Sequence, residues 1–122
     1  MGLDQYAYIK HGDGADDDRA ADFVWRKHSK LQTWAETLFT AKTGDPAEKL
    51  NCAELVLEAA DIAGLESLVR QKALPNSDGG FFFGHQFQDE AADENVEQDL
   101  AFCAWAKDAL TNGQTVVYSC WW

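Results

Sequence analysis

The amino-acid sequence predicts a small α+β domain, in which a mostly antiparallel sheet of about four strands is covered by three helices. The chain has 122 residues, a length typical of one domain, so we expect a single domain over 1–122. Hydrophobic residues make up 46% of the chain and include five tryptophans, which is enough for a core despite a net charge of −11. Strand-like and helix-like segments follow in the order β-β-α-β-α-α-β, which indicates helices on one face of a sheet.

The first two predicted strands form a hairpin. Residues 3–10 are rich in tyrosine and aliphatic side chains, and residues 22–27 contain Phe-Val-Trp between charged residues. The tract HGDGADDD at 11–18 separates them. Because glycine and aspartate favour turns, this tract is expected to be a solvated loop.

A helix is predicted to follow the hairpin. Ser29 and Gln32 fit the S-x-x-Q pattern of a capping box, which marks a helix start. Gly44 can end the helix, and Pro46 cannot continue it. The apolar residues that recur at helical spacing are Leu31, Trp34, Leu38 and Ala41.

Residues 51–58, NCAELVLE, predict a short third strand before a second helix. Asp61 can cap that helix, and Pro75 follows its end. Its apolar face is expected to consist of Ile62, Leu65, Leu68, Val69 and Ala73.

A third helix is predicted to start near Asp93 and to end at Gly113. Its centre, LAFCAWA at 100–106, is apolar nearly all round, so we expect it to be the most buried helix. The closing segment TVVYSCWW is rich in β-branched and aromatic residues and predicts a strand. A strand this apolar needs cover, most simply by pairing near the N-terminal strand.

The acidity is concentrated in two segments. Residues 1–20 have a net charge of −3 and residues 75–99 a net charge of −7, whereas residues 21–50 are slightly basic at +1. Such a chain has no general attraction to nucleic acid, so direct nucleic-acid binding is not expected. No run of 18 apolar residues is present, which predicts no membrane span. The start lacks the pattern of a signal peptide, which favours a cytoplasmic location.

Four short motifs span most of the chain. They are MGLDQY at the start, WRKH at 25–28, GGFFFG at 79–84 and the closing strand with Tyr118, Ser119 and Trp121. Together they resemble a family of small proteins encoded by phages and cyanophages. The resemblance implies a phage or cyanophage-like source, and hence the cytoplasm of a host cell. It implies no established activity and transfers no catalytic residues, and the loop at 11–18 and the segment around His85 depart from the family pattern.

The best candidate binding site is the basic cluster Arg26, Lys27, His28 and Ser29, which lies at the start of a predicted helix. Helix N-termini attract anions, and arginine can grip a phosphate or carboxylate at two points. The alternative is that these cations pair with the chain's own carboxylates, such as Asp22 or Glu36. A glycine-containing turn could bring backbone groups close to the same ligand, and its candidate residues are Asp78, Gly79 and Gly80.

Other chemistry finds little support in the sequence. His11 and His85 lie near acidic residues, but no calcium-loop or zinc spacing is present, so we expect neither a metal nor a cofactor. Ser119 could meet His28 in space, although no nucleophile motif surrounds it. The cysteines Cys52, Cys103 and Cys120 show no CxxC motif and are expected to be reduced.

Two functions remain open. The first is a non-enzymatic, phage-type accessory protein that binds a host or phage protein, or a second copy of itself through the tryptophan-rich C-terminal strand. The second is a binder of, or a small enzyme acting on, an anionic, phosphorylated small molecule at the WRKH and GGFFFG segments, with His28 as acid and base. The sequence does not show whether the acidic segments have a function of their own or only make the protein soluble.

Overall fold

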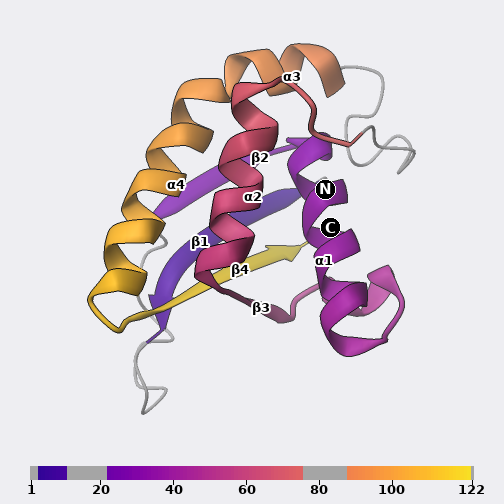
Figure 1. Ribbon diagram of the computed structural model, residues 1–122. Coiled ribbons are helices and arrows are strands. Elements are labelled where there is room, and N and C mark those ends of the chain that lie inside the picture. Colours follow the sequence, from indigo (N-terminus) through magenta and orange to yellow (C-terminus); the bar gives the residue numbers. More distant parts are fainter. Residues whose placement is uncertain (1–2, 11–21, 76–87, 122) are drawn as a thin grey trace.

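The computed structural model describes residues 3–10, 22–75 and 88–121, and it confirms the predicted α+β fold (Figure 1). The described strands form one four-stranded sheet in the order β2-β1-β4-β3, with each neighbouring pair antiparallel. The elements are β1 (Asp4–Lys10), β2 (Phe23–Arg26), α1 (Ser29–Thr43), the 3-10 helix η1 (Ala47–Leu50), β3 (Glu54–Leu57), α2 (Ala59–Arg70), α3 (Gln88–Glu94), α4 (Val96–Thr111) and β4 (Thr115–Trp121).

Strand β4 lies in the middle of the sheet, between β1 and β3. It pairs with β1 along seven residues, from Asp4 opposite Trp121 to Lys10 opposite Thr115. The predicted pairing of the last strand with the first is therefore confirmed. Strands β2 and β3 have four residues each and form the two edges.

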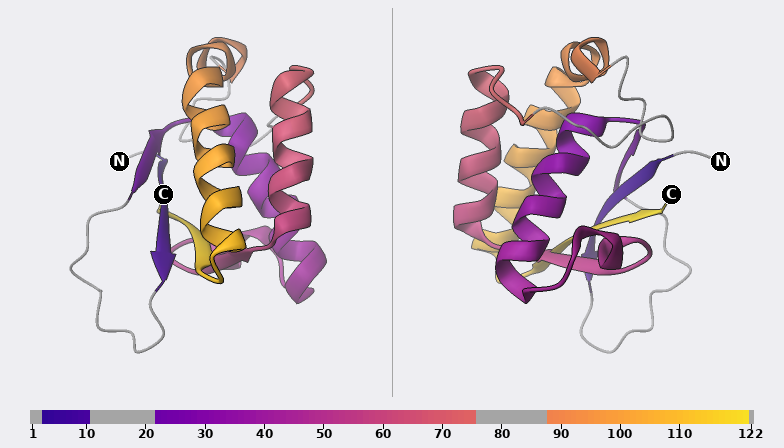
Figure 2. Two further views of the ribbon diagram at one scale, coloured as in Figure 1. Left: turned by 60° about the vertical axis from the view of Figure 1, so that its left-hand side comes forward. Right: turned by 90° about the vertical axis from the view of Figure 1, so that its right-hand side faces the viewer.

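Helices α1, α2 and α4 lie on the same side of the sheet (Figure 2). Because side chains alternate along a strand, every second residue faces these helices. Ala7, Trp25, Leu55 and Tyr118 are such inward residues, and each is almost fully buried. They pack in one core with apolar residues of the helices, among them Phe39, Leu65 and Phe102. The molecule thus has two layers, and the second face of the sheet carries no described helix.

The start of α1 differs from the prediction. The helix begins at Ser29 itself, after an N-cap at His28 that makes no side-chain capping hydrogen bond. The predicted capping box is therefore wrong, because the side chain of Gln32 is hydrogen-bonded to Tyr118 instead. The predicted end is confirmed: Gly44 has a φ of 77°, a left-handed conformation that glycine adopts without strain, and donates its N–H to Thr40 O.

Two further helix starts are corrected. Asp61 is not the N-cap of α2; it is the third helical residue, and its side chain accepts the N–H of Glu58 in a capping box. The helix predicted near Asp93 is two helices, α3 and α4, separated at Asn95. Helix α4 is also not the most buried helix, because five of its 16 residues are buried, as are five of the 15 in α1, and Ala104 is exposed.

No helix within 3–10, 22–75 and 88–121 is long and apolar enough to cross a bilayer.

Candidate functional site

The predicted anion-site residues Arg26 and Lys27 lie on the surface, where β2 ends. Lys27 has a φ of 56° and donates its backbone N–H to Leu3 O. Arg26 Nε lies 3.8 Å from Asp4 Oδ1, and both side chains are well exposed. The arginine therefore lies beside a carboxylate of its own chain, on the neighbouring strand. This is the alternative that the sequence left open, although the partner is Asp4 and not Asp22 or Glu36.

His28 and Ser29, in contrast, are fully buried. The left-handed turn at Lys27 lies between β2 and α1 and redirects the chain, so the next residue enters the core. The four residues of the basic cluster therefore do not share one surface. Asp78, Gly79 and Gly80 lie outside the described residues, and so do His11 and His85.

Inside the core, His28 contacts a carboxylate. Its Nε2 lies 2.8 Å from Asp99 Oδ2, and Trp25 Nε1 donates to Asp99 Oδ1 over 2.8 Å. Asp99 comes from the first turns of α4 and is also almost fully buried. A carboxylate without water needs such donors on both oxygens, since an unpaired buried charge is strongly unfavourable. This contact ties β2, α1 and α4 together.

The role of Asp99 escaped the sequence analysis, although the sequence contains a signal for it. Asp99 precedes Phe102, Cys103 and Ala106 by three, four and seven residues, so it shares their buried helix face. An acidic residue on the apolar face of a helix predicts a buried donor, and the only partners in the described chain are 71 and 74 residues away in sequence.

A second buried polar chain connects β1 to α1. The Gln5 side chain accepts the backbone N–H of His28 and donates to its carbonyl, at 2.9 and 3.1 Å. Gln5 Nε2 also donates to the Tyr118 hydroxyl, which in turn donates to Gln32 Oε1 over 2.6 Å. Burial raises the pKa of Tyr118 well above its ordinary value, so the hydroxyl remains a donor. These bonds hold the first turn of α1 against the sheet.

Two buried side-chain atoms at this junction have no hydrogen-bond partner among the described residues: His28 Nδ1 and Ser29 Oγ. Both belong to the region where β2 passes into α1. Neither is exposed, so a substrate has no access to them in this conformation. The arrangement supports a structural role for His28.

Ser119 and His28, whose meeting the sequence allows but does not favour, lie on opposite sides of the sheet. Ser119 Oγ donates to Ala53 O, and Ser119 pairs with Tyr6 on the outward side of the sheet. His28 lies on the other side, under the helices. Among the described residues no group of histidine, cysteine, aspartate and glutamate could hold a metal ion.

The outward face of the sheet is the second candidate site. Across the strands, Val24 lies opposite Tyr6, and Tyr8 lies opposite Val117, which lies opposite Val56. The three most exposed large apolar side chains in the described chain are on this face: Trp121 at 59%, Val24 at 53% and Val56 at 47%. Tyrosines at every second position of β1 are the sequence signal for it.

Charged residues form two ion pairs on this face. Lys10 Nζ lies 2.7 Å from Glu54 Oε1, and the Tyr8 hydroxyl donates to the other oxygen of Glu54. Hydrogen bonds from Lys10 and Tyr8 lower the pKa of Glu54, which keeps its carboxylate charged. Arg26 and Asp4 form a second pair beside Trp121. The Lys10–Glu54 pair therefore spans β4 next to Val117, which is fully buried, and the exposed Val24 and Val56 lie on the two edge strands. The charges of the two pairs cancel on this face.

Comparison of the chain with protein-family models, with curated proteins and with solved structures found no match.

Proposed function

We propose that this chain is a non-enzymatic interaction module, of the phage accessory type, that binds a basic partner protein through the outward face of its sheet. One observation carries the proposal: the face bears Trp121, Val24 and Val56, each about half exposed or more, and no described helix covers it. Exposed aromatic and aliphatic side chains gathered on one surface are typical of protein interfaces.

The charge of the chain supports a basic partner. The charges of the two ion pairs on the face cancel locally, whereas the chain as a whole carries −11. A positively charged protein is therefore attracted over long range, and association should weaken as salt is added. The same charge repels a second copy. Strand β4 also has both edges paired, so self-association through that strand could use only its face.

The alternative, an anionic small molecule held by Arg26, Lys27 and His28, has less support among the described residues. His28 is fully buried and engaged by Asp99, and Arg26 lies beside Asp4. A general acid or base must reach the reacting group of the substrate. The buried imidazole of His28 does not.

Photo-crosslinking tests the proposal. A benzophenone amino acid replaces Val56 on the outward face, and in a matched protein it replaces Ala104, which is exposed on α4. Both proteins are irradiated in a bacterial lysate at low and high salt. We expect the Val56 position, but not the Ala104 position, to give a discrete adduct with a protein of high isoelectric point, and the adduct should decrease at high salt.

Adducts that are the same from both positions, or that do not depend on salt, would overturn the proposal. A product at twice the mass of the chain would assign the face to self-association instead. A Trp121→Ser variant provides a second check, because it should weaken the Val56 adduct without lowering the melting temperature.

A further inference from the structure

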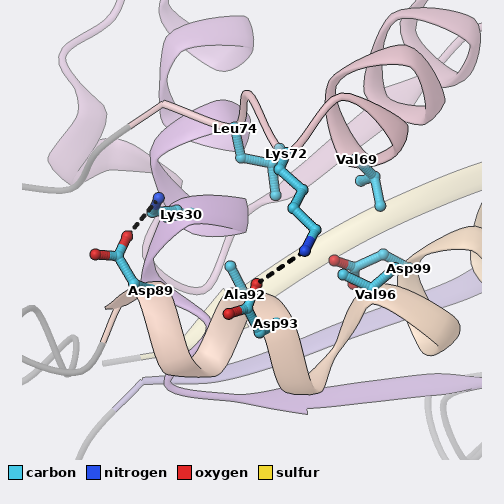
Figure 3. A pocket seen from close by; sticks show the side chains of 9 residues that line it. All are labelled: Lys30, Val69, Lys72, Leu74, Asp89, Ala92, Asp93, Val96 and Asp99. Carbon is cyan, nitrogen blue, oxygen red and sulfur yellow. Dashed lines mark ion pairs between the residues drawn. The ribbon is translucent and has the colours of Figure 1, made fainter.

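A pocket of about 260 Å³ lies where α1 begins, α2 ends and α3 meets α4. It lies among the helices, which cover the other side of the sheet from the outward face described above (Figure 2). Figure 3 shows side chains from all four helical regions around it. Its apolar lining is Val69, Leu74, Ala92 and Val96, and its charged lining is Lys30, Lys72, Asp89, Asp93 and Asp99.

Lys30 is the cation set deepest in this lining. Its side chain is only 12% exposed, yet its partner Asp89, 2.8 Å away, is 83% exposed. Because Asp89 is so exposed, water competes for its carboxylate, so the carboxylate of a ligand can replace Asp89 beside Lys30. An ammonium also has three N–H donors, so Lys30 can bind a ligand oxygen while it keeps Asp89.

The position of Lys30 in α1 adds to its positive potential. It is the second residue of the helix, whose first turn contains no acidic residue and no side-chain cap. The free N–H groups of such a turn carry a partial positive charge. Ser29, in the same turn, has a buried hydroxyl without a hydrogen-bond partner in the described part of the chain, although it does not line the pocket.

The carboxylates around the pocket are engaged or exposed. Asp99 directs both oxygens to donors in the core, Trp25 Nε1 and His28 Nε2. Asp93 lies 4.0 Å from Lys72, an ion pair drawn in Figure 3, and both of these side chains are well exposed. Two ammonium groups line the pocket, and Lys30, at 12% exposure, is far less exposed than Lys72, at 74%. A ligand shielded from water would therefore meet Lys30 rather than Lys72.

We propose that this pocket binds a small organic carboxylate, whose carboxylate group is held by Lys30 at the start of α1 and whose apolar chain lies against Val69, Leu74 and Val96. The volume lies slightly below the roughly 300–1,000 Å³ of pockets for drug-sized ligands, which favours a short chain. The site is independent of the sheet face, so either proposal can fail without the other.

Three probes that differ only in their head group test the inference: hexanoate, hexan-1-ol and hexylamine. Each is titrated into ¹⁵N-labelled protein while amide chemical shifts are recorded. We expect hexanoate to shift the amides of Lys30 and Val96 with saturation, and the alcohol and the amine to bind at least about tenfold more weakly. Equal binding of the alcohol, tighter binding of the amine, or no saturable shift with hexanoate would overturn the proposal.

Variants locate the head group. Lys30→Met keeps the aliphatic stem and should weaken hexanoate binding at least about tenfold, whereas Lys30→Arg should retain most of it. Lys42→Met is the matched control on the same helix, since Lys42 pairs with Glu58 and Asp61 away from the pocket, and it should leave hexanoate binding unchanged. Unchanged binding in folded Lys30→Met would exclude the proposed head-group position. The wild-type comparison of the three probes does not depend on how the variants fold.

Discussion

Asp99 is an acidic side chain in the core, with Trp25 and His28 on its two carboxylate oxygens. In Asp99→Ala both of these buried ring nitrogens lose their partner. We expect the free energy of unfolding to fall by about 2–5 kcal/mol, measured by urea denaturation. Asp93→Ala is the control, because that exposed carboxylate should change stability by less than about 0.5 kcal/mol. Equal effects of the two variants would contradict the structural role of Asp99.

The three cysteines differ in how they should react. Burial raises the pKa of the Cys103 and Cys120 thiols to about 12, whereas Cys52 is exposed. Because the thiolate is the reactive form, iodoacetamide should modify the native protein once, at Cys52, and the denatured protein at all three positions. Mass spectrometry counts the additions. Native labelling that persists in Cys52→Ser would show that a buried thiol is accessible.

Sequence reasoning succeeded and failed for different residues. Gly44 was predicted correctly as the end of α1, because the left-handed conformation depends on local chain geometry. His28 was expected at a surface, but its partner Asp99 lies 71 residues away. Gln32 fitted a local capping pattern, yet a partner 86 residues distant holds its side chain. Local sequence patterns do not reveal hydrogen bonds between residues this far apart in sequence. It is these bonds that allow the polar side chains of His28 and Gln32 to be buried.

At the scale of elements, the hydroxyl of Tyr118 joins β4 to α1 through Gln32 and to β1 through Gln5. Tyr118→Phe removes this link and leaves two buried amides with fewer partners. We expect a loss of about 1–3 kcal/mol in the free energy of unfolding. Tyr8→Phe is the matched control, since it removes an exposed hydroxyl that donates to Glu54 and should change stability by less than about 1 kcal/mol. A larger loss in Tyr8→Phe than in Tyr118→Phe would contradict this account.

The elements themselves were largely predictable. The tyrosine and aliphatic residues of 3–10 and the β-branched and aromatic residues of 115–122 predicted two strands that pair, and these strands do pair. The break between α3 and α4 at Asn95 was missed, because the acidic residues on both sides of it suit a single helix start. The outward sheet face was anticipated only through the tryptophan-rich last strand, and the part of Val24 and Val56 in it was missed, since uncovered and covered faces alternate in the same way along a strand.

For the whole molecule, two buried thiols and a buried phenol predict a loss of stability at alkaline pH. The native pKa of Cys103, Cys120 and Tyr118 is raised by burial, so the native state holds these protons more tightly than the unfolded state does. The part of the stability that the protonated thiols contribute is therefore fully present below the ordinary thiol pKa of 9.0 and is lost as the pH rises above it. The urea midpoint should fall between about pH 8 and about pH 11. A Cys103→Ala, Cys120→Ala double variant should show a shallower decline, and an equally steep one would contradict the assignment.

Strand β4 follows every other described element in the chain, yet it lies between β1 and β3. During synthesis on the ribosome, the inner edges of those two strands therefore emerge before the strand that pairs with them. Partners such as Gln5 and Tyr118 are 113 residues apart, so a large loop must close in the final step. We expect folding to be completed after residues 115–121 leave the ribosome, with the unpaired edges of the nascent chain open to chaperones until then.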